Sequence, residues 1–253
     1  MKQTVKRLVF QPYFNLLKTL RHAGVLKTPT IKICISTIEK YAAKTIPDLL
    51  TSLYAAGIKK EDIYVVEGGH QQNRKIEHAV NYYHADHNSF DLTALISVVD
   101  LNIETDYWFL LHDTCVVGTN FQNLISNVPH SLPEVLVLRN FPSMNMGLYK
   151  KDYLLRKKDV LFSMRNRDYS NEGVLAAKKK AIDEEDILFK QKDIDGKVWV
   201  INPWLMKIDG NYRISSTDAH NYYSDRIVEY FPQVDLYKFK ANFNMSRTNI
   251  IDL

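Results

Sequence analysis

A short run of bulky apolar residues ends on two side chains that can ligate a metal ion. Residues 107–112 are Tyr-Trp-Phe-Leu-Leu-His, and Asp113 and Thr114 follow. A run of this length without helical gaps is typical of a fully buried strand. Because ligands of open α/β sheets bind at the carboxyl ends of the strands, His112 and Asp113 are predicted to lie at a binding edge. One carboxylate there would suit a hard divalent cation and a diphosphate.

Polar side chains also follow the other apolar runs. The first run ends in Ser-Thr-Ile-Glu, the second ends in Glu-Gly-Gly, and a polar stretch at 86–89 precedes the run at 107–112. Hydroxyls and carboxylates suit a ribose, and glycines let a ring or phosphate approach closely. Ordinary polar turns between strands and helices are the alternative interpretation. We predict that these strand ends line one pocket, formed by Ser36, Thr37, Glu39, Glu67 and Asn88.

The elements that would position these residues alternate along the chain through about residue 140. This alternation predicts βαβ units and a largely parallel sheet, that is, an α/β fold. The Pro in Thr45-Ile-Pro-Asp48 favours a helix start, and Gly57 favours its end. Strands are expected at Ile31–Ser36, Asp62–Glu67, Tyr82–Ala85, Tyr107–His112, Glu134–Leu138 and Met144–Tyr149, and helices at Ile46–Ala56, Asp91–Leu101 and about 171–190.

Composition sets the broad class. The chain has 253 residues, 45% of them hydrophobic and 25% charged, which is ordinary for a globular protein. The two cysteines, Cys34 and Cys115, lie inside apolar runs, which indicates buried thiols in a reducing compartment. The N-terminus lacks the apolar core of a signal peptide, and no 18-residue apolar stretch occurs. We therefore expect a cytoplasmic protein.

The N-terminal segment differs in charge from the rest of the chain. Residues 1–38 contain seven Lys or Arg and no acid, although the net charge of the whole chain is only +4. Pro12–His22 has the apolar spacing of an amphipathic helix. This helix packs on the body of the protein or makes peripheral contact with an anionic membrane surface. The charge pattern favours these neighbours over nucleic acid, and the expected division is 1–28 for the helix and 29–253 for one domain.

Residues 30–155 resemble the GT-A family of nucleotide-sugar-dependent glycosyltransferases. The resemblance rests on Ile-Lys-Ile-Cys-Ile-Ser-Thr from 31, Ile-Tyr-Val-Val-Glu from 63, Asn88 before a helix, the segment 107–114 and Ser-Met-Asn-Met-Gly-Leu-Tyr from 143. It implies a GT-A-like, mostly parallel sheet flanked by helices, with a nucleotide-binding part at about 30–140. The acceptor part, about 141–253, would be an irregular C-terminal elaboration. It also implies transfer from a donor such as a UDP- or GDP-sugar to a hydroxyl of a glycan, lipid-linked or protein acceptor.

The resemblance implies a metal as well. In the family, the segment like 107–115 carries an Asp-x-Asp motif that holds Mn²⁺ or Mg²⁺ against the diphosphate. Here Asp113 is the single carboxylate, and Cys115 stands where a second Asp would, although Cys is an unusual ligand for hard cations. Asp113 would then bind the metal with a distant group, His220 first and Asp218 second. Without a metal, Lys or Arg would neutralise the diphosphate.

Further site residues follow from the same resemblance. Asn145 and Gly147 would border the donor sugar, and His112 would lie in the nucleotide site. An inverting enzyme needs a carboxylate base, which family members place near the start of a helix beyond the sixth strand. Glu185, in the acidic run 183–186, is the candidate base beside Asp113. A solvated helical face is the alternative for that run.

Two other functions remain open from the residues. A sugar nucleotidyltransferase also places a metal-binding Asp at a sheet edge, but it usually has a glycine-rich phosphate loop, which the segment after the first strand lacks. No G-x-G-x-x-G follows that strand, and no G-x-x-x-x-G-K-[ST] occurs. A non-catalytic nucleotide-sugar-binding protein is the third possibility, favoured by the incomplete Asp-x-Asp motif.

Overall fold

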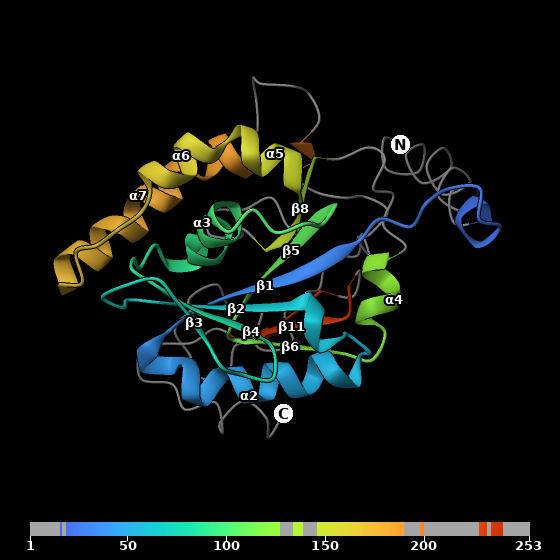
Figure 1. The fold of residues 1–253 in the computed structure, drawn as a ribbon, viewed down its shortest axis with the longest axis horizontal. Coiled ribbons are helices and arrows are strands. Elements are labelled where there is room, and N and C mark those ends of the chain that lie inside the picture. The colour runs from blue at the N-terminus through green and yellow to red at the C-terminus, as the bar shows by residue number, and fades with distance from the viewer. Residues whose placement is uncertain are drawn as a thin grey trace.

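The computed structural model describes residues 16, 19–126, 134–138, 146–189, 198–199, 228–231 and 234–239. The described residues form two sheets and several helices (Figure 1). The strands are β1 (Ile31–Ile38), β2 (Ile63–Gly68), β3 (Arg74–Ile76), β4 (Asn81–Ala85), β5 (Tyr107–His112), β6 (Cys115–Val117), β7 (Val135–Val137), β8 (Gly147–Lys150), β9 (Val198–Trp199), β10 (Val228–Phe231) and β11 (Leu236–Phe239). The helices are α2 (Glu39–Ala55), α3 (Thr93–Asp100), α4 (Phe121–Ser126), α5 (Lys151–Arg156), α6 (Lys158–Ser163) and α7 (Asn171–Phe189), with short 3₁₀ helices η1 (Lys60–Asp62) and η2 (Phe90–Leu92).

The main sheet has eight strands in the order β3-β4-β2-β1-β5-β8-β7-β9. The central strands β4, β2, β1 and β5 are parallel to one another, whereas β3 and β8 run antiparallel to their neighbours β4 and β5. From β1 the chain winds outward to β2 and β4, and it then returns to β5 on the other side of β1. The strand order therefore reverses between β1 and β5, and the predicted mostly parallel α/β fold is confirmed.

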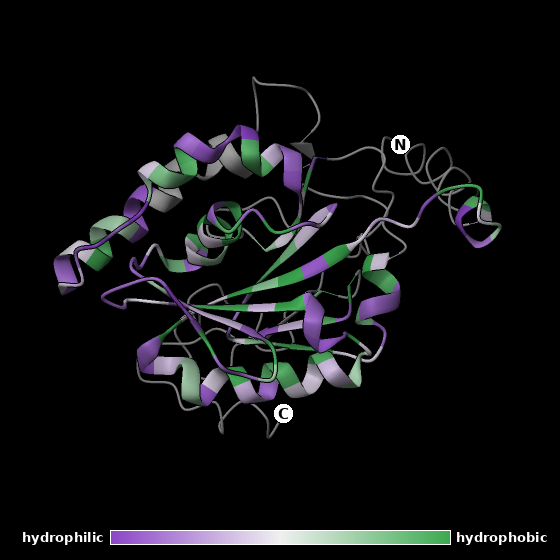
Figure 2. Cartoon of the chain, viewed as in Figure 1, coloured by the Kyte–Doolittle hydropathy of each residue, from purple (hydrophilic) through white to green (hydrophobic). Residues whose placement is uncertain are grey.

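Helices cover both faces of this sheet because successive strand side chains point to opposite sides. Ile33 and Ile35 of β1 pack in one buried cluster with α2, whereas Cys34 between them packs in a second cluster with α3, α5 and α6. Figure 1 shows α2 on one side of the sheet and α3, α5, α6 and α7 on the other. Figure 2 shows hydrophobic and hydrophilic segments alternating along α2, as a helix with one buried face requires.

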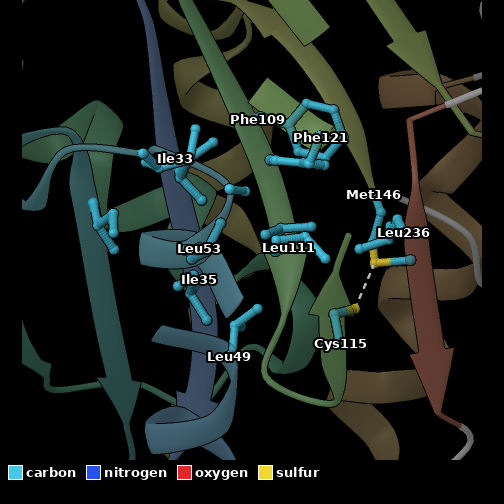
Figure 3. Close-up of a cluster of buried hydrophobic side chains, with 14 of the residues drawn as sticks. Ile33, Ile35, Leu49, Leu53, Phe109, Leu111, Cys115, Phe121, Met146 and Leu236 are labelled. Carbon is cyan, nitrogen blue, oxygen red and sulfur yellow. Dashed lines mark hydrogen bonds between the residues drawn. The ribbon is translucent and has the colours of Figure 1, made fainter. Parts of the chain in front are cut away.

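A small antiparallel sheet, β10-β11-β6, adds to the core on the α2 side. Leu236 of β11 is fully buried there, in the same cluster as Leu49 and Leu53 of α2. Cys115 of β6 lies in this cluster, where its sulfur is 3.4 Å from the sulfur of Met146 (Figure 3). The described residues of the C-terminal part of the chain thus contribute regular strands to the core.

The structure corrects the predicted start of the first helix. The sequence predicted a helix from Ile46 with Pro47 in its first turn, but α2 begins at Glu39 and contains Pro47. Pro47 is exposed, so its ring and missing N–H do not interrupt the buried face. That face extends back through Ala42 and Thr45, and its burial favours the two extra turns.

Other elements agree with the predictions or add to them. The strand expected at Tyr107–His112 is β5 with the same bounds, and the charged helix expected at about 171–190 is α7. The strands β3 and β6 were not predicted, because three residues are too short for a detectable alternation. Of the helix expected at Pro12–His22, residues 16 and 19–22 are described and helical. Within the described residues, no helix is long and apolar enough to cross a membrane.

Candidate functional site

Four polar residues form a continuous row at the carboxyl edge of the central strands. The sheet register pairs Thr37 of β1 with Glu67 of β2, and Glu67 with His84 of β4. Asp113 extends the row beyond β5, because its backbone N–H donates to the carbonyl oxygen of Ser36 at 3.2 Å. By strand alternation these side chains lie on the α2 face of the sheet, like Ile33 and Ile35. We call Asp113, Thr37, Glu67 and His84 the polar row.

At one end of the polar row, two threonine hydroxyls hold the Asp113 carboxylate. Its Oδ2 atom accepts hydrogen bonds from Thr37 Oγ1 at 2.8 Å and from Thr45 Oγ1 at 2.9 Å. Thr37 and Thr45 are buried, whereas Asp113 is half-buried. Among the residues that the structure describes, none donates to Oδ1 of Asp113, which leaves that oxygen able to bind a ligand. Thr45 is in this position because α2 begins two turns earlier than predicted.

At the other end, Glu67 lies among three ring side chains. Its Oε1 atom is 2.8 Å from His70 Nε2 and 3.9 Å from His84 Nε2, and its Oε2 atom accepts a hydrogen bond from the Tyr82 hydroxyl. The imidazole rings of His70 and His84 stack with their centroids 3.5 Å apart and their planes 1° from parallel. Both oxygens of Glu67 therefore have partners within the protein. The sequence had predicted a contact with a ribose for this residue and none of these partners.

Burial and neighbouring charges shift the pKa values of two groups in this cluster. Burial and the hydrogen bond to Glu67 raise the pKa of Tyr82, and the charges of Glu67 and Asp113 add to the effect. The Tyr82 hydroxyl consequently stays protonated and donates to Glu67. Burial, with a smaller contribution from His70, lowers the pKa of His84. His84 is thus predominantly neutral at pH 7.

The predicted pocket is split between the two faces of the sheet. Ser36 and His112 are register partners in β1 and β5, one residue before Thr37 and Asp113, so their side chains point to the α3 face. Ser36 Oγ donates to the Asp91 carbonyl at 2.8 Å and accepts from the Ala94 N–H at 2.9 Å. His112 is buried, with Nε2 3.4 Å from Asp91 Oδ2. The structure thus brings Thr37, Glu67 and Asp113 together, and it places Ser36 and His112 on the opposite face.

Asn88 belongs to a buried turn on the α3 side. Its Oδ1 atom accepts from the Phe90 N–H at 3.2 Å, and its own N–H donates to the Asn166 carbonyl at 2.7 Å. Beside it, His87 is 2% exposed and lies within 3.0 Å of Ser89 Oγ and 3.4 Å of Ser97 Oγ. Burial, with a smaller contribution from nearby Arg165, lowers the pKa of His87 to about 4. This histidine is therefore a neutral structural group.

A segment between α6 and α7 crosses the ends of β2 and β4. Arg167 binds Asp86 Oδ2 through Nε at 3.1 Å and through Nη2 at 2.7 Å. The Tyr169 hydroxyl donates to the His70 carbonyl at 2.9 Å. The His70 N–H in turn donates to the Ala85 carbonyl at 3.0 Å. These contacts fix the loop that carries His70 next to β4.

The remaining predicted site residues are only partly covered by the structure. Gly147 is buried at the start of β8, opposite Leu110 of β5. Glu39 is exposed at the first position of α2, and Glu185 lies in α7, although its side chain is outside the described residues. Asn145, Asp218 and His220 also lie outside them. Cys115 is fully buried in the core, so it does not share a ligand site with Asp113.

A lysine contacts Thr114, the residue that follows Asp113. Lys238 of β11 donates a hydrogen bond from Nζ to Thr114 Oγ1, and the Phe239 N–H donates to the Thr114 carbonyl at 2.9 Å. The pairing of β11 with β6 therefore places an ammonium group beside the residue that follows Asp113. Sequence reasoning did not predict this lysine, since its position depends on pairing between strands more than a hundred residues apart.

Comparison with known proteins gives little further guidance. No family model matches the chain, and no curated protein matches it. Among solved structures, the apo-form glycosyltransferase GlyE of Streptococcus pneumoniae TIGR4 is similar over 66% of this chain, with 12% sequence identity and a TM-score of 0.34. The match covers 41% of the GlyE chain.

Proposed function

We propose that this protein is a glycosyltransferase that moves a sugar from a nucleotide-diphosphate-sugar to an acceptor hydroxyl. The observation that supports this function is the position of Asp113. Its carboxylate follows β5 and is hydrogen-bonded to Thr37 at the end of β1, so it lies where the strand order reverses. In open α/β sheets, nucleotides usually bind outside the carboxyl ends of the strands, at the point where the strand order reverses.

The chemistry available at Asp113 suits a diphosphate. Mg²⁺ is commonly held by one or two carboxylates together with substrate phosphates, so a single Asp with one open oxygen fits such an ion. When bound, Mn²⁺ or Mg²⁺ would neutralise charge on the departing nucleoside diphosphate. Lys238, which contacts the neighbouring Thr114, could supply positive charge to the diphosphate. In both cases the protein would act mainly by stabilising the leaving group electrostatically.

The finer assignments are part of the same proposal. Thr37 would orient Asp113, Gly147 and Asn145 would border the donor sugar, and His220 would complete the metal site. Glu185 would deprotonate the acceptor hydroxyl if the reaction inverts the anomeric centre. The acceptor would be a glycan, a lipid-linked molecule or a protein. The basic N-terminal helix would bring the enzyme to a membrane surface where the acceptor is lipid-linked.

A thermal-shift screen tests the donor site. The purified chain is heated with UDP, GDP, CMP and their sugar conjugates, with and without Mn²⁺. A ligand that binds only the folded protein raises the melting temperature, by an amount equivalent to about 2.7 kcal/mol at a hundred times its Kd. We expect one nucleoside diphosphate to raise it, and Asp113→Asn to abolish any dependence on Mn²⁺.

The matched control is Asp62→Asn. Asp62 pairs with Lys32 at 3.0 Å at the amino end of β2, the edge opposite Asp113. This variant should keep the nucleotide response. The absence of a shift with every nucleotide would contradict the proposed site.

Turnover separates transfer from the two alternative functions. With the donor identified by the screen, we expect release of the nucleoside diphosphate, slowed by at least roughly 10²-fold in Asp113→Asn. Release of pyrophosphate would instead indicate a nucleotidyltransferase. Nucleotide binding without turnover on acceptors or water would indicate a binding protein.

A further inference from the structure

We propose that Glu67, His70 and His84 bind one divalent transition metal ion of the zinc class, through a carboxylate oxygen and two imidazole nitrogens. The three ligand atoms lie within 4.8 Å of one another. Two histidines and one glutamate are a sufficient protein ligand set for zinc when a water or substrate takes the fourth position. This site does not depend on glycosyl transfer and is separate from the predicted hard-cation site at Asp113.

The distances between the ligand atoms suit such an ion. Zinc bonds of about 2.0–2.1 Å place neighbouring ligand atoms of a tetrahedral site roughly 3.4 Å apart. Glu67 Oε1 is 2.8 Å from His70 Nε2 and 3.9 Å from His84 Nε2, so one distance is shorter and the other longer than this value. The two imidazole rings are stacked with their centroids 3.5 Å apart, so rotation of the side chains that tilts the rings toward each other would be needed for both nitrogens to reach one ion.

The backbone already holds the three residues in place. Glu67 and His84 are register partners in neighbouring strands β2 and β4. His70 is fixed by its N–H bond to Ala85 and by the Tyr169 hydroxyl on its carbonyl. An ion would therefore not have to order a loop and would only reorient side chains, which limits the cost of binding.

Tyr82 holds the Glu67 carboxylate through a hydrogen bond. Its hydroxyl donates to Oε2 of Glu67, which leaves Oε1 directed toward the two histidines. Metal-ligating carboxylates are typically hydrogen-bonded by such a second group, and its removal weakens metal binding by about 10–100-fold. The cluster thus has both the ligands and the supporting hydrogen bond of a metal site.

The ligand types and their exposure define the ion. Imidazole nitrogens favour zinc and its transition-metal neighbours over Mg²⁺ or Ca²⁺, which prefer all-oxygen sites. The side chains of Glu67, His70 and His84 are 10%, 16% and 19% exposed. An ion can therefore reach the three side chains from solvent.

Cobalt titration tests the site directly. The full chain is treated with a chelator and titrated with Co²⁺, whose visible absorption reports coordination by nitrogen ligands at low coordination number. We expect the absorption of nitrogen-ligated Co²⁺ to saturate at one ion per chain and to be abolished by one Zn²⁺. His70→Gln and His84→Gln should each weaken Co²⁺ binding at least about tenfold, and Tyr82→Phe about tenfold.

Two variants serve as controls. His78→Gln removes an exposed histidine near Tyr82 that lies outside the cluster, and it should leave Co²⁺ affinity unchanged. Asp113→Asn should also leave it unchanged, which separates this site from the donor site. Melting curves of the metal-free variants verify that each is folded.

The contrary results are equally specific. A wild-type Co²⁺ spectrum identical to that of the free aqua ion would show that the cluster is only a hydrogen-bonded His–Glu pair, and it would overturn the proposal. Equal Co²⁺ affinities in the wild type, His84→Gln and His78→Gln would overturn it as well. Either result can be read from the wild-type protein and folded variants without any activity assay.

Discussion

At the scale of single residues, strand alternation decides which side chains can act together. Thr37 and Asp113 lie on the α2 face, whereas the preceding residues, Ser36 and His112, lie on the α3 face. A nucleotide bound at Asp113 would consequently also contact Thr37, while Ser36 and His112 would stabilise the sheet behind it. Adjacent residues of one motif thus have different tasks.

The buried His87 should make stability depend on pH. In the folded chain its pKa is about 4, compared with 6.5 for an exposed histidine. Burial is the main cause, and the charge of Arg165 lowers the pKa further. Smaller effects come from Arg167, which lowers the pKa, and from Asp86 and Asp100, which raise it. The unfolded chain therefore takes up a proton between pH 6.5 and 4 that the folded chain does not. Stability from this group is complete above pH 6.5 and is lost as the pH falls toward 4.

Urea unfolding of the wild type and His87→Gln at several pH values measures this contribution. The 2.5-unit difference corresponds to about 3 kcal/mol, as an upper limit. We expect the wild type to lose up to that much more stability than the variant between pH 6.5 and pH 4. Parallel stability curves of the two proteins would show that His87 does not titrate in this way.

At the scale of elements, one hydroxyl joins β1 to the start of α3. Ser36 donates to the Asp91 carbonyl and accepts from the Ala94 N–H, and both partners lie at the junction of η2 and α3. Ser36→Ala leaves the buried Ala94 N–H without a partner, which should lower the free energy of unfolding by about 1–3 kcal/mol. Chemical denaturation measures the loss.

Ser163→Ala is the matched control for this prediction. The Ser163 hydroxyl is exposed and donates to the Val160 carbonyl within its own helix. Its removal should change stability by less than about 0.5 kcal/mol. Equal losses in the two variants would show that Ser36 does not link β1 to α3.

The elements also show what sequence reasoning could and could not reach. The run at Tyr107–His112 was placed correctly because it is continuously apolar and bounded by polar residues. The start of α2 was wrong, because a proline favours a helix start in isolation, and only packing against the sheet shows that Pro47 lies on an exposed face. His70 and His84 were missed because their proximity depends on the pairing of β2 with β4 and has no local pattern.

At the scale of the whole molecule, one core unites distant parts of the chain. Phe231, Val234 and Leu236 pack in the same cluster as α2 and the α2 face of the main sheet. The residues around Leu236 are therefore expected to unfold together with the central strands, in a single cooperative transition.

Leu236→Ala tests this coupling. Leu236 is fully buried, so the cavity left by the substitution should lower the free energy of unfolding by about 2–5 kcal/mol. The control Leu175→Ala removes a side chain that is 57% exposed and should have little effect. Tryptophan fluorescence and circular dichroism should report the same midpoint in each protein. Separate midpoints would show that the C-terminal strands and the central sheet unfold independently.

The register of the polar row also determines which kinds of genetic change the protein can tolerate. Insertion or deletion of one residue within β1, β2 or β4 would rotate every following side chain of that strand to the opposite face. Deletion of the residue between Tyr82 and His84 would thus turn the His84 imidazole away from Glu67, even though neither Glu67 nor His84 had been substituted. Length variation in related chains should therefore be confined to the turns between strands, while the spacing within each strand stays constant.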